Sequence, residues 1–289
     1  MTATSGGGRT EQGTSQWRAA DGAASARILL QPPHCIASNP GNSPMSDIKS
    51  GPRVRIAAVG DLHCRKTSTH TISPLLEAVN DRADVLVLCG DLTDHGTAEE
   101  AHILAKELGV VRIPKVGVLG NHDFESGHPE EVSAILEQAG VEMLDGEAVE
   151  VCGVGFAGTK GFIGGFGRGT LGGWGEAAIK RIVQEAIDEA LKLESALSRL
   201  RTERRIAVLH YAPIRETVEG EPVEIFPYLG CGRLAEPLNR YPVDALFHGH
   251  AHHGSPEGRT NAGIPIYNVA LPLLRTVTPE SPNFRVLQL

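Results

Sequence analysis

Residues 54–63 read VRIAAVGDLH, a short apolar run that ends in a glycine and an aspartate. The pattern returns in VLVLCGD at residues 85–91 and in VGVLGNHD at residues 116–123. Short apolar runs of this kind are typical of strands that are buried on both faces of a parallel sheet. Ligands of open α/β sheets bind at the carboxyl ends of the strands. We therefore expect the polar residues that follow the three glycines to lie close together.

Helical patterns separate these strands. They cover residues 71–82, 97–107 and 129–139, and Thr97-Ala98-Glu99-Glu100 predicts a capping box at the start of the second helix. Further strands are expected at residues 149–151, 154–157, 206–210, 245–248, 264–268 and 284–289. Strands joined by helices of this length predict right-handed βαβ units, a mostly parallel sheet and an α/β fold.

The segment at residues 158–201 interrupts this alternation. Its first part is rich in glycine, but it has neither of the glycine spacings that cradle phosphate groups. An amphipathic helix is expected at 176–201, because apolar residues recur there at helical spacing. Two interpretations stay open: the segment is a lid over the site, or the helix covers the sheet or contacts a second copy of the chain.

Composition narrows the classes of protein. No apolar run approaches the roughly 20 residues that cross a bilayer, which argues against a membrane protein. The 27 basic and 35 acidic residues give a formal net charge of −8, which argues against a protein that binds nucleic acid through its phosphates. The five cysteines are widely spaced without a Cys-x-x-Cys pair. That pattern predicts neither a disulfide framework nor a thiolate zinc site, and it favours a cytoplasmic location.

The first 44 residues differ from the rest of the chain. They are rich in Gly, Ser, Thr and Pro, and their apolar cluster is too short for the core of a signal peptide. Met45 opens a stretch that looks like a natural chain start. We expect one domain over residues 45–289, preceded at 1–44 by an extension that is either disordered or the product of a misassigned start.

Side chains that can bind metal ions gather in five blocks, each after an expected strand. The blocks are Asp61-x-His63, Gly90-Asp91, Gly120-Asn121-His122-Asp123, His210 and Gly249-His250-x-His252. Oxygen and imidazole donors without thiolate suit Zn²⁺, Mn²⁺ or Fe. Seven donors are too many for one tetrahedral ion and fit two ions that share Asp91. Two ions about 3.5–4 Å apart can activate water and hold both oxygens of a displacement at phosphorus.

The five blocks, in this order, resemble the signature of the calcineurin-like metallophosphoesterase superfamily. The resemblance spans residues 61–252 and implies a four-layer α/β/β/α sandwich with two mixed sheets. It also implies two metal ions, with Asp91 bridging them. The remaining ligands would be Asp61, His63 and His252 for the first ion, and Asn121, His210 and His250 for the second.

The same resemblance implies roles in catalysis. A hydroxide that bridges the metals would attack phosphorus, while His122 would protonate the leaving oxygen, a task that suits an imidazole. Asp123 would orient His122 through a hydrogen bond. The stretch Asp94-His95-Gly96 lacks the arginine of the serine/threonine protein phosphatases, and no tyrosine follows Asp61 as in purple acid phosphatases. The motif set looks more like the bacterial phosphodiesterase branch.

The expected function is hydrolysis of a small phosphodiester or nucleotide. A phosphomonoesterase would share every metal residue, so it stays an alternative. A nuclease is disfavoured by the acidic charge and by the 4% aromatic content. A non-catalytic scaffold is disfavoured because every ligand position and His122 are present. His248 and His253 are expected to be structural, whereas Arg65 and Lys66 either contact the substrate phosphate or belong to an exposed loop.

Overall fold

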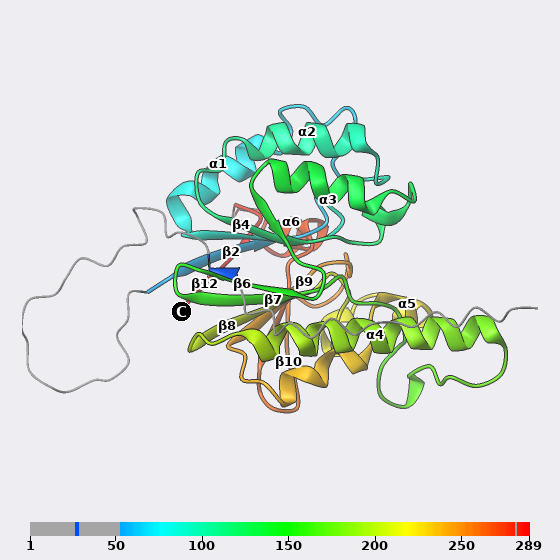
Figure 1. Ribbon diagram of the computed structural model, residues 1–289. Helices are drawn as coiled ribbons and strands as arrows, with labels where there is room; N and C mark the ends of the chain where they lie inside the picture. The colour runs from blue at the N-terminus through cyan, green and yellow to red at the C-terminus, as the bar shows by residue number, and fades with distance from the viewer. Residues whose placement is uncertain (1–26, 29–52, 281) are drawn as a thin grey trace, which may run out of the picture.

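The computed structural model describes residues 27–28, 53–280 and 282–289. Two mixed sheets lie face to face with helices on both outer sides, so the predicted four-layer α/β/β/α sandwich is confirmed (Figure 1). Helices α1 (Ser73–Arg82), α2 (Ala98–Leu108) and α3 (Pro129–Gln138) cover one sheet, and α4 (Ala177–Arg199) covers the other. The expected extension at residues 1–44 lies outside the described residues, apart from Arg27 and Ile28.

The five-stranded sheet carries the first three motifs. Its strand order is β12 (Arg285–Gln288), β2 (Arg55–Val59), β3 (Val85–Cys89), β4 (Lys115–Val118) and β5 (Val141–Met143). Strands β2 to β5 are parallel, and β12 is antiparallel to β2. Val59 lies opposite Leu88, and Cys89 lies opposite Val118. Because of this register, β2, β3 and β4 end at nearly the same level.

The seven-stranded sheet carries the last two motifs. Its strand order is β1 (Arg27–Ile28), β6 (Glu147–Val151), β7 (Val154–Gly158), β8 (Arg204–Val208), β9 (Ala245–His248), β11 (Pro265–Asn268) and β10 (Glu257–Arg259). The pairs β6–β7 and β10–β11 are antiparallel, and the other neighbours are parallel. Strands β8 and β9 lead directly to His210 and to the block that begins at Gly249.

A continuous apolar core holds the two sheets together. Ile56 and Val87 of the first sheet and Phe156 and Phe247 of the second are fully buried between them. Burial of a large apolar side chain stabilises the fold by about 1.5–3 kcal/mol. The two sheet edges that bear the motifs are therefore held against each other by packed side chains.

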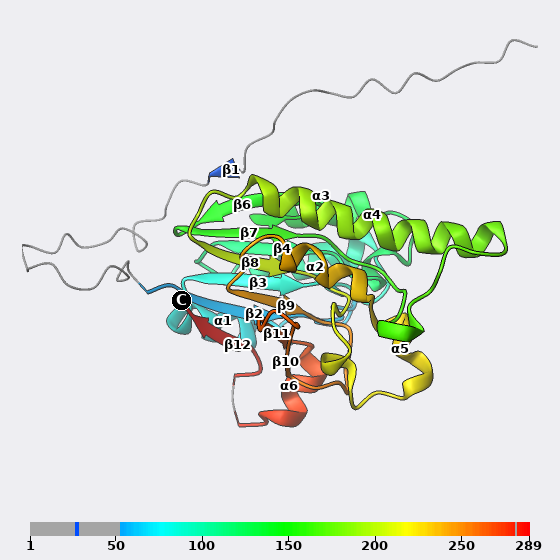
Figure 2. The ribbon, with the colours of Figure 1, turned by 90° about the horizontal axis from the view of Figure 1, so that it is seen from below.

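Helix α4, the second part of the segment at residues 158–201, packs on the seven-stranded sheet. It lies along β6 and β7, where Leu193, Ala196 and Leu197 are fully buried against Ala157 and Ala207 of the sheet. The helix therefore covers the sheet, as one of the two expectations held. Its first turns extend past the strand ends, on the side where α5 (Phe226–Leu229) lies (Figure 2).

Several short elements were not expected from the sequence. Strands β5 and β10 are three residues long, which is too short for a periodic pattern. Helix α6 (Leu271–Val277) was also missed. Among the described residues the 3₁₀ helices are η2 (His122–Phe124), η3 (Gly167–Gly169), η4 (Glu216–Val218), η5 (Val223–Ile225), η6 (Gly232–Ala235) and η7 (Pro237–Asn239). The capping box of α2 is confirmed, with the Thr97 side chain accepting from the Glu100 amide.

Two further expectations concern membrane spans and disulfides. Each helix in the described part of the chain is too short or too polar to cross a membrane. Cys64, Cys89 and Cys231 have free thiols. Cys152 is disulfide-bonded, which the spacing of the cysteines did not predict.

Candidate metal centre

The ends of β2, β3 and β9 place their polar residues in an uncommon backbone conformation. Asp61, His63, Asp91 and His250 have φ angles of 57°, 43°, 47° and 71°. A residue with a side chain is strained in this left-handed region by roughly 1–2 kcal/mol. Such strain persists where the surrounding structure fixes the backbone, and it gathers at functional sites. Here it turns four of the expected ligands toward one place.

The first donor group consists of Asp61, His63 and His252, whose ligand atoms lie within 4.8 Å of one another. The Nε2 atom of His252 is 2.9 Å from Asp61 Oδ1. Both ring nitrogens of His63 are buried and have no hydrogen-bond partner among the described residues. Burial lowers the pKa of His63, against the opposing effect of Asp91 and Asp61. A neutral imidazole with an unused lone pair is the form that binds a metal ion.

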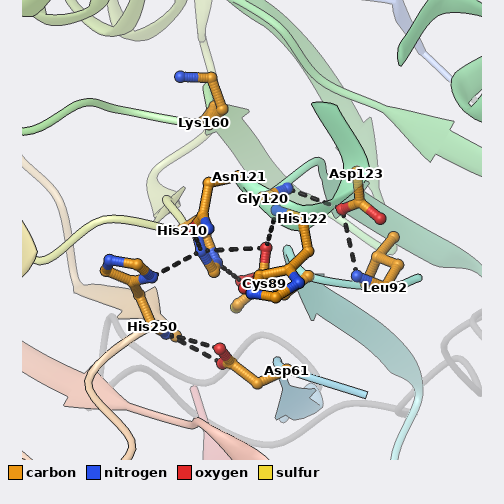
Figure 3. A network of polar contacts seen from close by, with 12 residues as sticks. Asp61, Cys89, Leu92, Gly120, Asn121, His122, Asp123, Lys160, His210 and His250 are labelled. Atoms are coloured by element: carbon orange, nitrogen blue, oxygen red, sulfur yellow. Dashed lines mark hydrogen bonds and ion pairs between the residues drawn. The ribbon is translucent and has the colours of Figure 1, made fainter. Parts of the chain in front are cut away.

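The second donor group consists of Asp91, His210 and His250, again within 4.8 Å of one another. The Nε2 atom of His210 lies 3.1 Å from His250 Nδ1, 2.9 Å from Asn121 Oδ1 and 3.4 Å from Asp91 Oδ1 (Figure 3). The Nδ1 atom of His210 is 3.0 Å from the Cys89 carbonyl oxygen, which can only accept. That contact holds the proton on Nδ1 and leaves Nε2 for a ligand.

Asp91, a member of the second donor group, also faces the first. Its Oδ2 atom is 3.9 Å from His63 Nε2, while its Oδ1 atom is 3.4 Å from His210 Nε2. The side chain is almost completely buried, and a buried carboxylate needs positive charge or hydrogen bonds around it. The two groups together offer imidazole nitrogens, carboxylate oxygens and one amide oxygen, a donor set that fits Zn²⁺, Mn²⁺ or Fe. The structure therefore brings all seven expected ligands together.

Proton release on metal binding is the first prediction. Burial favours neutral His210, but the charges of Asp91 and Asp61 outweigh it and raise the pKa to about 9. In the metal-free protein at neutral pH this ring therefore carries a proton that a metal ion must displace. The affinity for Mn²⁺ should rise with pH up to about 9 and then level off. Calorimetric titrations in buffers of different ionisation enthalpy measure both effects, and a pH-independent affinity contradicts the ligand role of His210.

Two glycines of the motifs are required by contacts with the ligands. A Cβ atom on Gly120 would lie 2.2 Å from both the amide nitrogen and Oδ1 of Asp91. A Cβ atom on Gly249 would lie 2.3 Å from Asp61 Oδ2. Each glycine thus leaves room for a ligand that comes from a different strand.

A Gly120→Ala variant tests this packing. The added methyl group should displace Asp91 and lower the free energy of unfolding by about 1–3 kcal/mol, the usual cost of overpacking. Metal content should fall in parallel. Gly169→Ala is the matched control, because nothing lies within 4 Å of its added Cβ. Thermal melting and metal analysis of both variants measure the effects, and equal behaviour of the two refutes the explanation.

His122 lies at the start of η2, beside the first donor group. Its ring centroid is 4.6 Å from that of His63. Its Nδ1 atom is 2.7 Å from the carbonyl oxygen of Asp94, so Nδ1 donates and Nε2 faces away from that bond. Its backbone amide donates to Asp91 Oδ1 at 2.8 Å. The residue is therefore fixed through both its ring and its backbone.

Asp123 was expected to orient His122 through a hydrogen bond. Its carboxylate instead accepts from the backbone of two motif loops, and the His122 ring donates to the carbonyl oxygen of Asp94. Asp123 accepts from the amides of Leu92, Thr93 and Gly120 at 3.1, 2.8 and 2.8 Å, and from Thr93 Oγ1 at 2.6 Å. Burial and the nearby charge of Asp91 raise its pKa. The residue connects the second and third motifs instead of orienting His122.

Asp94 was missed as a member of the site. Its Oδ1 atom is 3.3 Å from His63 Nδ1, and its Oδ2 atom is 2.9 Å from Arg65 Nε. With His63 and His122 it forms a third group of close donor atoms. Its position three residues after Asp91 was the available signal. Arg65 is paired with this carboxylate, and Lys66 is paired with Glu99, so both belong to charge pairs of the loop.

Three polar residues, two of them singled out in the sequence, support the loop that carries the last motif. His248 is fully buried, and its Nε2 atom lies 2.8 Å from Thr217 Oγ1. The Asn268 side chain donates to the Ala251 carbonyl oxygen at 2.7 Å. The amide of His253 donates to Glu221 at 2.7 Å. These contacts agree with the structural roles expected of His248 and His253.

A polar cleft opens from the first donor group. It has a volume of 600 Å³, and we define it by Asp61, His63, Arg65, His122, His252 and Arg275, which lie along its wall. Asp94 also lines the cleft and pairs with Arg65, so Arg275 is the group of this wall that would attract an anionic ligand. The ring of His122 borders this cleft, where it can reach a bound group.

Two sheets whose strand ends bring carboxylate, amide and imidazole donors together define an α/β protein with a candidate two-metal centre. The chain belongs to the calcineurin-like phosphoesterase family, whose model it matches over residues 54–254. No curated protein matches the sequence significantly. This chain carries all five sequence blocks that led to the family resemblance.

The solved structures that this chain is similar to are distant in sequence. The crystal structure of the phosphopantetheinyl hydrolase PptH from Mycobacterium tuberculosis has a TM-score of 0.58 at 16% identity, covering 80% of this chain and 95% of that one. A protein of Thermus thermophilus has a TM-score of 0.47 at 14% identity, covering 75% of this chain and 89% of that one. At 16% identity the likeness to PptH concerns the fold alone.

Proposed function

We propose that the protein is a metal-dependent hydrolase of phosphate esters that uses two metal ions and prefers a small phosphodiester. The observation that carries this proposal is the position of Asp91 between two donor groups of similar size. Each group offers at least three ligand atoms within 4.8 Å of one another. Membership of the calcineurin-like phosphoesterase family supports the same reaction.

The ligands fall into two sets. Asp61, His63 and His252 would hold one ion, and Asn121, His210 and His250 would hold the other, with Asp91 shared. When bound, such ions activate water and stabilise the negative charge that develops on a phosphoryl group. Because the ligand atoms come from both sheets, the packed core between the sheets keeps them at fixed distances.

Side chains of the protein would assist departure of the leaving alcohol and attract the substrate. The Asp94 carbonyl oxygen accepts from Nδ1 of His122, so the ring would give a proton to the departing alcohol from Nε2 in its doubly protonated form. Its place on the wall of the polar cleft favours departure of the alcohol into that cleft. Arg275, an exposed residue of the same wall, would attract the anionic substrate.

A phosphomonoesterase, a nuclease and a scaffold without activity are the alternatives, and two features favour a small diester. The formal charge of −8 disfavours a long nucleic acid as substrate. Two separate cavities border the donor groups, which suits a phosphate with two ester groups. The disulfide at Cys152 argues against the cytoplasmic location that the cysteine spacing favoured. The proposed partner is the substrate alone, and a contact with a second copy of the chain stays a prediction.

The test compares bis(p-nitrophenyl) phosphate with p-nitrophenyl phosphate. Metal-free protein is reloaded in turn with Mn²⁺, Zn²⁺, Fe²⁺ and Mg²⁺, and the bound metal is counted in each sample. We expect about two ions per chain, as in other dinuclear esterase centres, and a higher kcat/KM for the diester. A preference for the monoester contradicts the diester assignment. Two bound metals without turnover of either ester contradict the hydrolase and favour a scaffold.

A further inference from the structure

A second cavity borders the donor groups on the side of Asn121. It has a volume of 420 Å³, within the range of small-molecule sites. We call it the aromatic pocket and define it by Asn121, Phe124, Lys160, Phe162, Ile182 and Tyr211. The exposed side chains of Arg181 and Glu185 also line it, so Lys160 is its buried charged group. Its walls come from η2, from the segment after β7, from the first turns of α4 and from the segment after β8.

The aromatic pocket is joined to the second donor group through Tyr211 and Asn121. The ring centroid of Tyr211 lies 4.5 Å from that of His250 and 5.3 Å from that of His210. The Asn121 Oδ1 atom is 2.9 Å from His210 Nε2. A group bonded to a phosphate over the two donor groups would therefore reach the pocket directly.

Lys160 is the unusual member of this wall. The residue as a whole is 9% exposed, and its Nζ atom lies 4.8, 5.2 and 5.4 Å from the ring centroids of Phe162, Phe124 and Tyr211. The rings stabilise the ammonium group through cation–π contacts. The Nζ atom donates to the Gly161 carbonyl oxygen at 2.9 Å. No carboxylate of the described residues lies within ion-pair distance of it.

The Lys160 ammonium group has more hydrogen-bond donors than partners among the described residues. A lysine has three N–H donors, of which one is directed to the Gly161 carbonyl oxygen. Burying a charge without a full set of partners is unfavourable, and burial accordingly lowers the pKa of Lys160. The backbone carbonyl oxygen of the same residue accepts from the amides of His210 and Tyr211, at 3.0 and 3.1 Å. The backbone of Lys160 is therefore fixed beside His210, whereas its ammonium group is directed away from His210 and His250 (Figure 3).

We propose that the aromatic pocket binds one ester group of the substrate, a planar ring system with a hydrogen-bond acceptor that Lys160 contacts. Rings stack on or pack edge-to-face against aromatic walls, and Ile182 adds an aliphatic surface. A carbonyl oxygen, a ring nitrogen or a nitro oxygen would accept from the ammonium group. This inference rests on the proposed hydrolase function and makes Lys160 a specificity-determining residue.

The pocket would take the ester group that stays on phosphorus. His122, the candidate proton donor to the leaving oxygen, lies on the wall of the polar cleft, which opens from the other donor group. The leaving alcohol would therefore depart into the polar cleft. The substrate class is a phosphodiester with two different arms: one arm is planar and bears an acceptor, and the other departs on the arginine-lined side.

Three diesters with the same leaving group test the assignment. Bis(p-nitrophenyl) phosphate retains an aryl group with an acceptor, phenyl p-nitrophenyl phosphate retains one without, and methyl p-nitrophenyl phosphate retains neither. All release p-nitrophenolate, so one readout serves for all. After correction for the uncatalysed rates, kcat/KM should decrease in that order in the metal-loaded protein.

Two pocket variants and one control sharpen the test. In Lys160→Met, the ratio of kcat/KM for the bis(p-nitrophenyl) ester to that for the methyl ester should fall by about 10-fold or more, since the variant loses a charge-assisted hydrogen bond. In Phe162→Ala, both aryl esters should lose their advantage. Lys180→Met removes an exposed lysine of α4 and should leave the ratio unchanged. Metal content and melting temperature of each variant exclude a general loss of structure.

Product inhibition provides a second readout. p-Nitrophenyl phosphate should inhibit the wild-type protein more strongly than methyl phosphate, and Lys160→Met should reduce that difference. If both pocket variants keep the wild-type ratio while still hydrolysing the esters, the pocket assignment is overturned and the hydrolase function stands. If the metal-loaded wild-type protein hydrolyses none of the three esters, the hydrolase function itself fails.

Discussion

Replacing Asp91 with asparagine is expected to lower the metal content to one ion per chain or fewer and to reduce kcat by about 1,000-fold or more, because two ions contribute several kcal/mol to such reactions. Both losses follow from the position of the Asp91 carboxylate between His63 and His210. It is almost fully buried, and its two oxygens face His63 on one side and His210 on the other. An asparagine keeps the shape but removes the negative charge that both ions would share.

The measurement combines metal analysis with turnover of bis(p-nitrophenyl) phosphate. Asp188→Asn is the matched control, because Asp188 is an exposed residue of α4, on the outer face of the other sheet. It should keep its metal ions and its activity. An Asp91→Asn protein that retains two ions and normal turnover contradicts the bridging role.

Replacing His122 with alanine is expected to give the opposite combination: the metal content is kept, and turnover is lost. General acid catalysis by one side chain contributes about 10²- to 10⁴-fold. The loss should be largest for esters with a strongly basic leaving alcohol, which needs a proton to depart. It should be smaller for p-nitrophenyl esters, since p-nitrophenolate leaves readily without one.

A series of diesters with leaving groups of increasing basicity measures this dependence. His128→Ala is the control, because His128 is exposed, lies six positions further along the chain and makes no side-chain cap to α3. A loss in His122→Ala that is equal for every leaving group contradicts the role of proton donor and favours a role in positioning the phosphate. An unchanged kcat excludes both roles.

The sequence predicted the fold and the convergence of the ligands because both follow from local patterns. Apolar runs that end in glycine and a polar residue define the strands and what lies at their ends. The glycines mark close contacts, as Gly120 does beside Asp91. Even the family resemblance depended on such blocks, each no longer than four residues.

The sequence did not predict contacts between residues that are far apart along the chain. Asp123 hydrogen-bonds to Leu92 and Thr93, 31 and 30 positions away, and these bonds exist only once β3 and β4 pair. The setting of Lys160 likewise depends on rings from three separate segments. No periodic pattern in the sequence predicts that these three rings surround one lysine, so the aromatic pocket could be found only in the folded structure.

The most direct test of the central claim, that two metal ions share Asp91 and act together, is a titration of metal-free protein with Mn²⁺. Electron paramagnetic resonance and the hydrolysis of bis(p-nitrophenyl) phosphate are followed at each step. The account predicts that activity rises mainly with the second equivalent, together with the spectrum of a spin-coupled pair of ions. Full activity at one equivalent, with the spectrum of isolated Mn²⁺ throughout, would contradict it.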